Sequence, residues 1–91
     1  MKTSATHVLA IESEDLLREL GHRISIARRA RGITQADLAA QVGAGLSTVR
    51  HIEGGAPSVQ IGYVVGCLWA LELIEELRPA VPSLVRGSGI A

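Results

Sequence analysis

The sequence predicts a small all-α domain of five helices. Its length of 91 residues corresponds to one domain, which buries about 60–65% of its unfolded surface on folding. Hydrophobic residues make up 47% of the chain, but Phe is absent and Trp and Tyr occur once each, so the core must be aliphatic. Apolar residues recur at three- and four-residue spacings in segments that end at glycine, which is the pattern of amphipathic helices.

The first helix is expected to begin at Ser13, whose hydroxyl precedes two acidic residues in the positive first turn. It is expected to end at Gly32. Residues 1–12 are then a flexible N-terminal arm, and residues 13–78 form the folded domain. The apolar stripe of this helix comprises Leu16, Leu17, Leu20, Ile24, Ala27 and Ala30.

Two short helices are expected next, over residues 35–42 and 46–53. Thr34 can cap the first of them, and Gly43 can adopt the positive φ that a sharp turn requires. Val49 and Ile52 face inward from the second. Two helices of about two turns joined by a short turn containing glycine are typical of a helix-turn-helix unit.

A fourth helix is expected after Ser58, and a short fifth one over residues 73–77, ended by Pro79. Residues 79–91 contain two prolines and two glycines without periodicity, which predicts a C-terminal tail. The inward face of the fourth helix is expected to comprise Ile61, Val64, Val65, Leu68 and Leu71.

The zero net charge of the chain hides an uneven distribution. Residues 18–50 carry six arginines against two acidic residues, a net charge of +4, and the remainder carries −4. A basic segment of this kind is typical either of a surface that faces a polyanion or of a solvated helix face.

Several classes of protein are excluded by what the sequence lacks. The single cysteine, Cys67, provides no disulfide framework and is expected to be a small core residue. The longest apolar run, residues 61–71, is too short to span a bilayer, and the absence of a signal-like start predicts a cytoplasmic location. No catalytic constellation, Gly-rich phosphate loop or Cys/His cluster is found, so we expect no enzyme, no cofactor, no metal and no membrane partner.

The run GITQADLAAQVGAGLSTVRHIEGG resembles the Xre/Cro type of helix-turn-helix domain, which occurs in phage repressors and bacterial antitoxins. The resemblance extends over about residues 20–71 and implies a lambda-repressor-like bundle that binds double-stranded operator DNA. It implies that Gln35 binds a DNA phosphate and that Arg28 and Glu53 form a structural ion pair. The DNA-binding residues that it implies on the second helix of the unit are Leu46, Ser47, Thr48, Arg50 and His51.

Two positions depart from the family pattern. Gly45 stands where Ser or Thr usually caps the recognition helix, and Leu46 stands where a polar residue is usual. Leucine can pack on a thymine methyl group but cannot hydrogen-bond a base. Direct readout is therefore expected from Ser47, Arg50 and His51, although a lone histidine also fits a solvated surface.

The segment SVQIGYVVGCLWALELIEELRPAVP is similar to HipB-like antitoxins, which are encoded beside HipA-like kinases. This resemblance implies a homodimeric repressor of its own operon that neutralises a HipA-like kinase toxin, with Glu72, Glu75 and Glu76 as candidates for contacting it. Trp69 and Leu73 are predicted at the dimer interface, where aromatic residues are enriched. Two alternatives remain: a stand-alone or phage-type transcriptional regulator, and a protein-interaction module with little DNA recognition.

Overall fold

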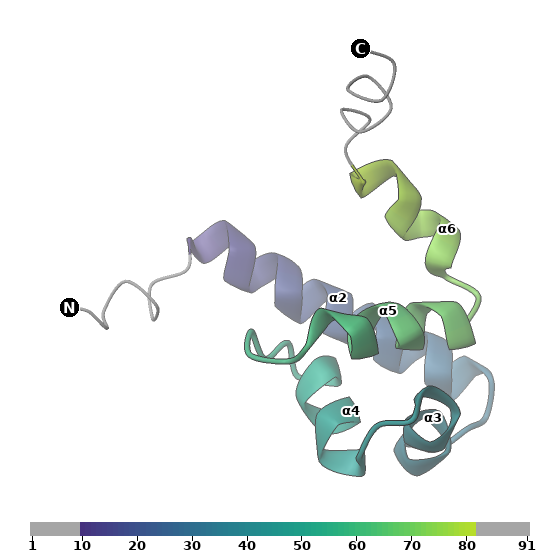
Figure 1. Ribbon diagram of the computed structural model, residues 1–91. Helices are drawn as coiled ribbons and strands as arrows, with labels where there is room; N and C mark the ends of the chain where they lie inside the picture. Colours follow the sequence, from purple (N-terminus) through teal and green to yellow (C-terminus); the bar gives the residue numbers. More distant parts are fainter. Residues whose placement is uncertain (1–9, 82–91) are drawn as a thin grey trace.

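The computed structural model describes residues 10–81, and within this range it contains helices and no strand. Helices α2 to α5 surround one core, and α6 leads away from them at the far end of α5 (Figure 1). The predicted all-α fold with five helices is confirmed for the described residues. Its elements are α2 (Ile11–Ala30), α3 (Gln35–Val42), α4 (Leu46–Glu53), α5 (Ile61–Ala70), α6 (Ile74–Leu77) and a final 3-10 turn, η1 (Arg78–Ala80).

Helix α2 begins at Ile11, two residues before the expected start at Ser13. The amide of Ser13 is already bonded to the carbonyl of Ala10 at 2.9 Å, so it belongs to the first turn instead of capping it. A side-chain cap is worth only about 1 kcal/mol, and Glu12 in the positive first turn favours the earlier start. Residues 11 and 12 are thus helical, while residues 1–9 of the expected arm and 82–91 of the expected tail lie outside the described range.

Helices α3 and α4 have the bounds that the sequence predicts. Thr34 and Asp37 form a reciprocal capping box, in which the Thr34 hydroxyl accepts from the Asp37 amide at 3.0 Å and Asp37 accepts from the Thr34 amide at 2.9 Å. Gly43 ends α3 with a φ of 72°, and Gly45 begins α4 in an extended conformation without a side-chain cap. These local signals end α3 at Val42 and begin α4 at Leu46, with a turn over residues 43–45 between them.

The core is aliphatic, as predicted, and lies where α2, α3, α4 and α5 meet. Cys67 is fully buried in it, and burial raises the pKa of its thiol to about 11. The thiol therefore stays protonated and packs as a small apolar group. The buried residues are Ile24, Leu38, Ala39, Val49, Ile52, Cys67, Leu68 and Leu71.

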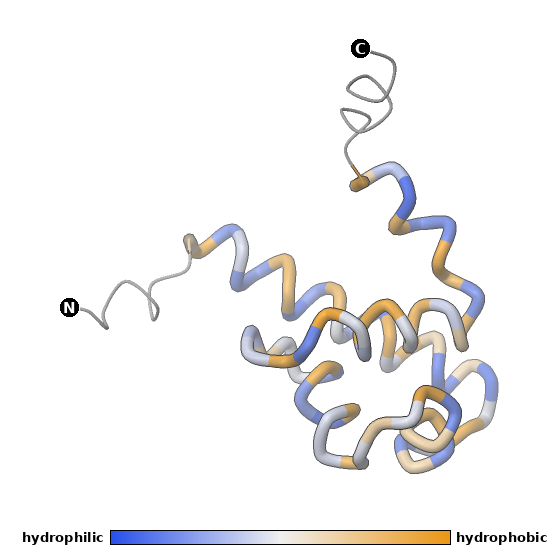
Figure 2. The backbone as a smooth tube through the Cα atoms, in the orientation of Figure 1, coloured by the Kyte–Doolittle hydropathy of each residue, from blue (hydrophilic) through white to orange (hydrophobic). Residues whose placement is uncertain are grey.

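Three residues predicted on inward stripes are exposed instead: Leu16 at 65%, Ile61 at 76%, and Ala30 at the last position of α2. Helix α5 begins at Ile61, with Gln60 rather than Ser58 at its N-cap, so Ile61 lies at the very end of the packed surface. The first turns of α2 project beyond the other helices (Figure 1), which leaves Leu16 without cover. Because α5 carries no charged residue (Figure 2), its sequence marks its inward face only weakly.

Helix α2 lies close to the end of α4 at Gly21. A Cβ atom at this position would lie 2.3 Å from the carbonyl oxygen of Ile52 and 2.7 Å from that of Glu53. Because both neighbours are backbone atoms at the end of α4, only glycine permits this approach. Gly21 therefore sets the position of α4 relative to α2.

Candidate nucleic-acid interface

Helix α4 has a buried face and an exposed face. Val49 and Ile52 are 0% and 4% exposed and anchor the helix to the core. Among the described residues, no ion pair or side-chain hydrogen bond engages Ser47, Arg50 or His51. The helix therefore presents polar groups that remain able to bind a ligand. Of the predicted DNA-contacting residues of α4, Thr48 is partly buried. The other four are exposed: Leu46, Ser47, Arg50 and His51.

An ion pair between Arg28 and Glu53 holds the C-terminal end of α4 against α2. Arg28 Nε lies 2.6 Å from Glu53 Oε2, and Arg28 Nη2 lies 3.2 Å from Glu53 Oε1. The two side chains are only 11% and 7% exposed. Arg28 Nη1 also donates to the carbonyl of Ile33 at 2.8 Å, so one guanidinium joins α2, the loop before α3, and α4. These are the two residues for which the Xre/Cro resemblance implies an ion pair.

Gln35 completes this network from α3. Its Nε2 atom donates to Glu53 Oε1 at 3.0 Å. A side-chain amide has two N–H groups, so one remains after the bond to Glu53. Gln35 is the first residue of α3, where the positive end of the helix dipole favours an anion. Its position is compatible with a phosphate contact, which stays a prediction.

The network also fixes the charge of Glu53. Burial alone would raise the pKa of this carboxyl group, but the hydrogen bonds from Arg28 and Gln35 outweigh that effect and hold the pKa below its ordinary value of 4.5. A carboxylate with a lowered pKa in the folded state stabilises the fold above its unfolded pKa. That contribution is lost as the pH falls through the lower, folded-state pKa.

We therefore expect the free energy of unfolding to decrease as the pH is lowered below about 4.5. The Glu53→Gln variant should be less stable at neutral pH. Its free energy of unfolding should also decrease less on acidification, because the glutamine side chain cannot take up a proton. Urea denaturation followed by circular dichroism at a series of pH values measures both. An equal dependence of the free energy of unfolding on pH in the two proteins would contradict a lowered pKa of Glu53.

The two residues predicted at a dimer interface lie in different surroundings. Trp69 on α5 is 68% exposed. Leu73, between α5 and α6, is partly buried against the core and lines a groove between α2 and α6. Trp69 is not among the residues that line this groove, so the two side chains are not brought together there.

Gly21 positions the site and was not recognised from the sequence. The signal that could have revealed it is a single glycine inside a helical pattern, where it costs about 1 kcal/mol relative to alanine. Such a residue persists where packing requires it, and here it admits the carbonyl groups at the end of α4.

Two further searches of the described residues concern other classes of site. Residues 10–81 contain no cluster of three or more His, Cys, Asp or Glu side chains that could hold a metal ion. In the same range, no helix combines the length and apolar character required to cross a membrane.

A comparison with known protein families identifies the family to which this chain belongs. A family model described as a helix-turn-helix domain matches residues 19–81. The matched segment contains α3 and α4 whole, most of α2, and everything from α5 to η1. No curated protein and no solved structure matches the chain. Because the match covers well over half of the sequence, the chain belongs to the helix-turn-helix domain family, a family of DNA-binding domains.

Proposed function

We propose that this protein is a sequence-specific DNA-binding transcriptional regulator of the Xre/Cro type. The observation that carries the proposal is the exposed face of α4, which is held in place by the nearly buried pair of Arg28 and Glu53. The major groove of B-DNA admits an α-helix, whose first turns then reach the base edges. Helix α4 is therefore the recognition helix.

Each predicted contact residue has a chemical role that suits it. Arg50 donates two hydrogen bonds to guanine O6 and N7, while Ser47 and His51 bond to neighbouring base edges. Leu46, which is 37% exposed, packs on a thymine methyl group. Gln35 and Thr48 bind the phosphate backbone, which fixes the register of α4 on the duplex without reading sequence.

The regulator acts as a repressor that reads a two-fold operator as a homodimer. Two copies of α4 related by two-fold symmetry contact half-sites about one helical turn, roughly 34 Å, apart. Occupation of such a site over a promoter excludes the polymerase. The basic segment over residues 18–50 supplies the long-range attraction to DNA.

Fluorescence anisotropy with the protein's own promoter fragment, at two salt concentrations, tests the function. We expect tighter binding to this fragment than to a scrambled duplex of equal length, and weaker binding to both at the higher salt concentration because phosphate contacts release counterions. Equal affinity for the two duplexes would contradict the regulator proposal and favour the alternative of a protein-interaction module with little DNA recognition.

For Arg50→Ala we expect discrimination between the operator and scrambled DNA to fall by about 1–3 kcal/mol, which is roughly 5- to 150-fold. The melting temperature should stay within about 4 °C of the wild-type value, because Arg50 is exposed and contributes little to packing. Anisotropy and thermal melts measure the two quantities.

Arg78→Ala is the matched control for this prediction. Arg78 lies on η1, at the far end of the molecule from α4 (Figure 1), and pairs with Glu75. The control should bind the operator with wild-type selectivity. Unchanged selectivity in Arg50→Ala would show that α4 is docked in a different register.

A finer proposal is that the regulator is the antitoxin of a HipBA-like module and represses its own operon. It is supported by the resemblance of residues 58–82 and by exposed acidic residues after α5. Glu72 and Glu75 pair within the chain with Arg31 and Arg78, whereas Glu76 shows no such pair in the described range. Calorimetric titration with a HipA-like kinase should show binding that charge removal at Glu72 and Glu75 weakens. Absence of binding would leave the stand-alone or phage-type regulator.

A further inference from the structure

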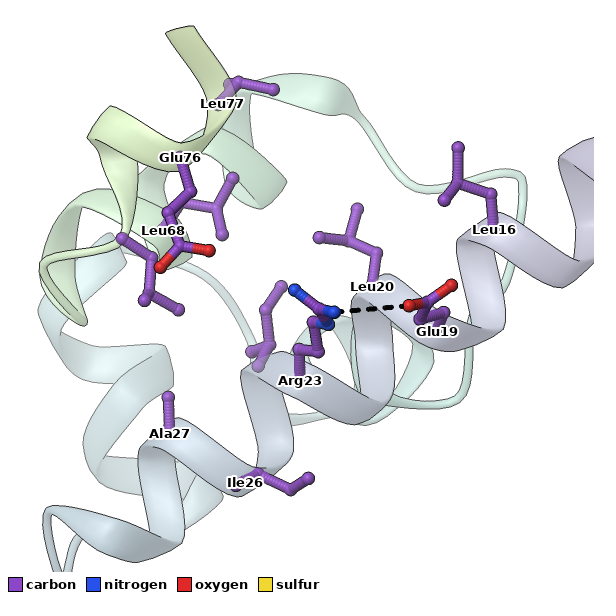
Figure 3. A pocket seen from close by; sticks show the side chains of 11 residues that line it. Leu16, Glu19, Leu20, Arg23, Ile26, Ala27, Leu68, Glu76 and Leu77 are labelled. Carbon is purple, nitrogen blue, oxygen red and sulfur yellow. Dashed lines mark ion pairs between the residues drawn. The ribbon is translucent and has the colours of Figure 1, made fainter. Parts of the chain in front are cut away.

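An apolar groove separates α2 from α6. It has a volume of about 430 Å³. Figure 3 shows Leu16 and Leu20 on the α2 wall and Leu77 on the α6 wall, with Leu68 of α5 beside them. A second apolar cavity of about 390 Å³, next to Pro57, shares Leu16 and Leu20 with the groove. One segment of α2 therefore borders apolar hollows on two sides.

Large apolar side chains remain uncovered along this surface. Leu16 is 65% exposed, Ile26 is 48% exposed, and Ile11 at the start of α2 is 72% exposed. Soluble monomers rarely expose apolar patches larger than a few hundred Å², and larger ones mark interaction sites. Removal of these side chains from water favours an occupant for the groove.

Three charged side chains line the groove: Glu19 and Arg23 on the α2 wall, and Glu76 on the α6 wall. Arg23 lies on the α2 wall and Glu76 on the α6 wall (Figure 3), and within the described residues they form no ion pair with each other. Arg23 Nη2 lies 3.4 Å from Glu19 Oε2, and both side chains are more than half exposed. A two-fold interface sets residue i of one copy against residue j of the other, and j against i. A two-fold arrangement can therefore place Arg23 of each copy against Glu76 of the other, at two equivalent contacts.

We propose that the occupant of the groove is a second copy of this chain. The two copies pair about a two-fold axis, with Arg23 of each protomer against Glu76 of its partner. The first turns of α2, which project from the helical body (Figure 1) and expose Ile11 and Leu16, supply the convex apolar element that fills the groove of the partner. Burial of these side chains provides the affinity, and the two ion pairs fix the orientation.

Helix α5 offers a competing apolar surface. Ile61 and Trp69, 76% and 68% exposed, lie two turns apart on one side of this helix. This stripe is convex, and α5 carries no charge that would orient a second copy. The groove combines apolar area, concave shape and paired charges, so the observations favour it over the α5 stripe.

This inference deepens the proposed function and rests on it for its biological role, since two paired copies present two α4 helices to a two-fold operator. Self-association is measured without DNA, however. A protein that binds its operator but does not pair through the groove would contradict this inference alone. A protein that pairs through the groove but does not recognise DNA would contradict the proposed function alone.

Analytical ultracentrifugation of the full-length chain over a range of concentrations tests the interface. Arg23→Glu and Glu76→Arg each set like charges against one another at both contacts of a two-fold dimer. We expect either variant alone to raise the dimer dissociation constant by at least about tenfold. In an equimolar mixture of the two variants, both contacts join opposite charges again. The mixed heterodimer should therefore form with an affinity close to that of the wild type.

Arg29→Glu on α2 and Glu75→Arg on α6 are matched controls, because they make the same charge changes at exposed positions that neither line the groove nor belong to the first turns of α2. They should leave the dissociation constant unchanged, and thermal melts should show every variant folded. A wild-type chain that stays monomeric would overturn the proposal and leave the groove to residues 82–91 or to a different protein. A dimer whose dissociation constant is unchanged in both Arg23→Glu and Glu76→Arg would also overturn the proposal. If that dimer were lost in Trp69→Ala, the pairing surface would be assigned to α5.

Discussion

Arg28→Ala is expected to lower the free energy of unfolding by about 3–5 kcal/mol, because it leaves a nearly buried carboxylate without its partner. Glu53 is only 7% exposed, so water cannot replace the two hydrogen bonds from the guanidinium. The carbonyl of Ile33 loses its donor as well. A loss of this size amounts to a large part of the total stability of a small domain. Thermal and urea denaturation measure it.

Three further variants separate the buried pair from general effects of charge. Arg29→Ala, at an exposed position one residue along α2, should change stability by less than about 0.5 kcal/mol. Arg28→Lys should recover only part of the loss, because an ammonium group cannot contact both carboxylate oxygens and the Ile33 carbonyl in the same planar geometry. Replacing both partners, as in Arg28→Met with Glu53→Leu, should be less harmful than Arg28→Ala. A wild-type melting temperature in Arg28→Ala would contradict the importance of the pair.

Gly21→Ala is expected to destabilise the fold by about 2 kcal/mol or more. An alanine in a helix interior would normally be favoured by about 1 kcal/mol. Here its Cβ would lie 2.3 Å from the carbonyl oxygen of Ile52, and neither backbone can move without displacing α4 from the core. Forced overpacking costs roughly 1–3 kcal/mol or more, and backbone neighbours place this case at the upper end. The same displacement should weaken operator binding.

Gly62→Ala on α5 is the control for that prediction. Nothing lies within 4 Å of a Cβ atom at Gly62, so the helix-propensity gain of up to about 1 kcal/mol is not offset by a clash. Thermal melts of the two variants should therefore shift in opposite directions. A stabilised Gly21→Ala protein would show that α2 and α4 are not in close contact.

The helix-turn-helix unit could be predicted from sequence because its signals are local. Thr34 with Asp37 makes a capping box, and Gly43 adopts the left-handed conformation that ends α3. Each signal acts within a few residues, so the chain itself encodes the bounds of α3 and α4. The pairing of Arg28 with Glu53 joins residues 25 positions apart, and only the resemblance to a known family suggested it.

Features that depend on how far the packing surface extends could not be predicted. The spacing of Leu16 and Ile61 identifies a helix face correctly but does not reveal where the neighbouring helices end. The groove between α2 and α6 could not be predicted either, because it depends on the angle at which α6 leaves α5 (Figure 1). The tight contact at Gly21 involves backbone atoms of α4, which leave no trace in side-chain periodicity.

The central claim is that the outward side of α4 enters the DNA major groove, and an NMR titration of isotope-labelled protein with its promoter duplex tests it most directly. The account predicts that the largest amide shift changes fall on residues 45–51 and on Gln35 at the start of α3. It also predicts that these changes persist when a scrambled duplex is added as competitor. Shift changes confined to α5 and α6, with α4 unaffected by the promoter duplex, would contradict it.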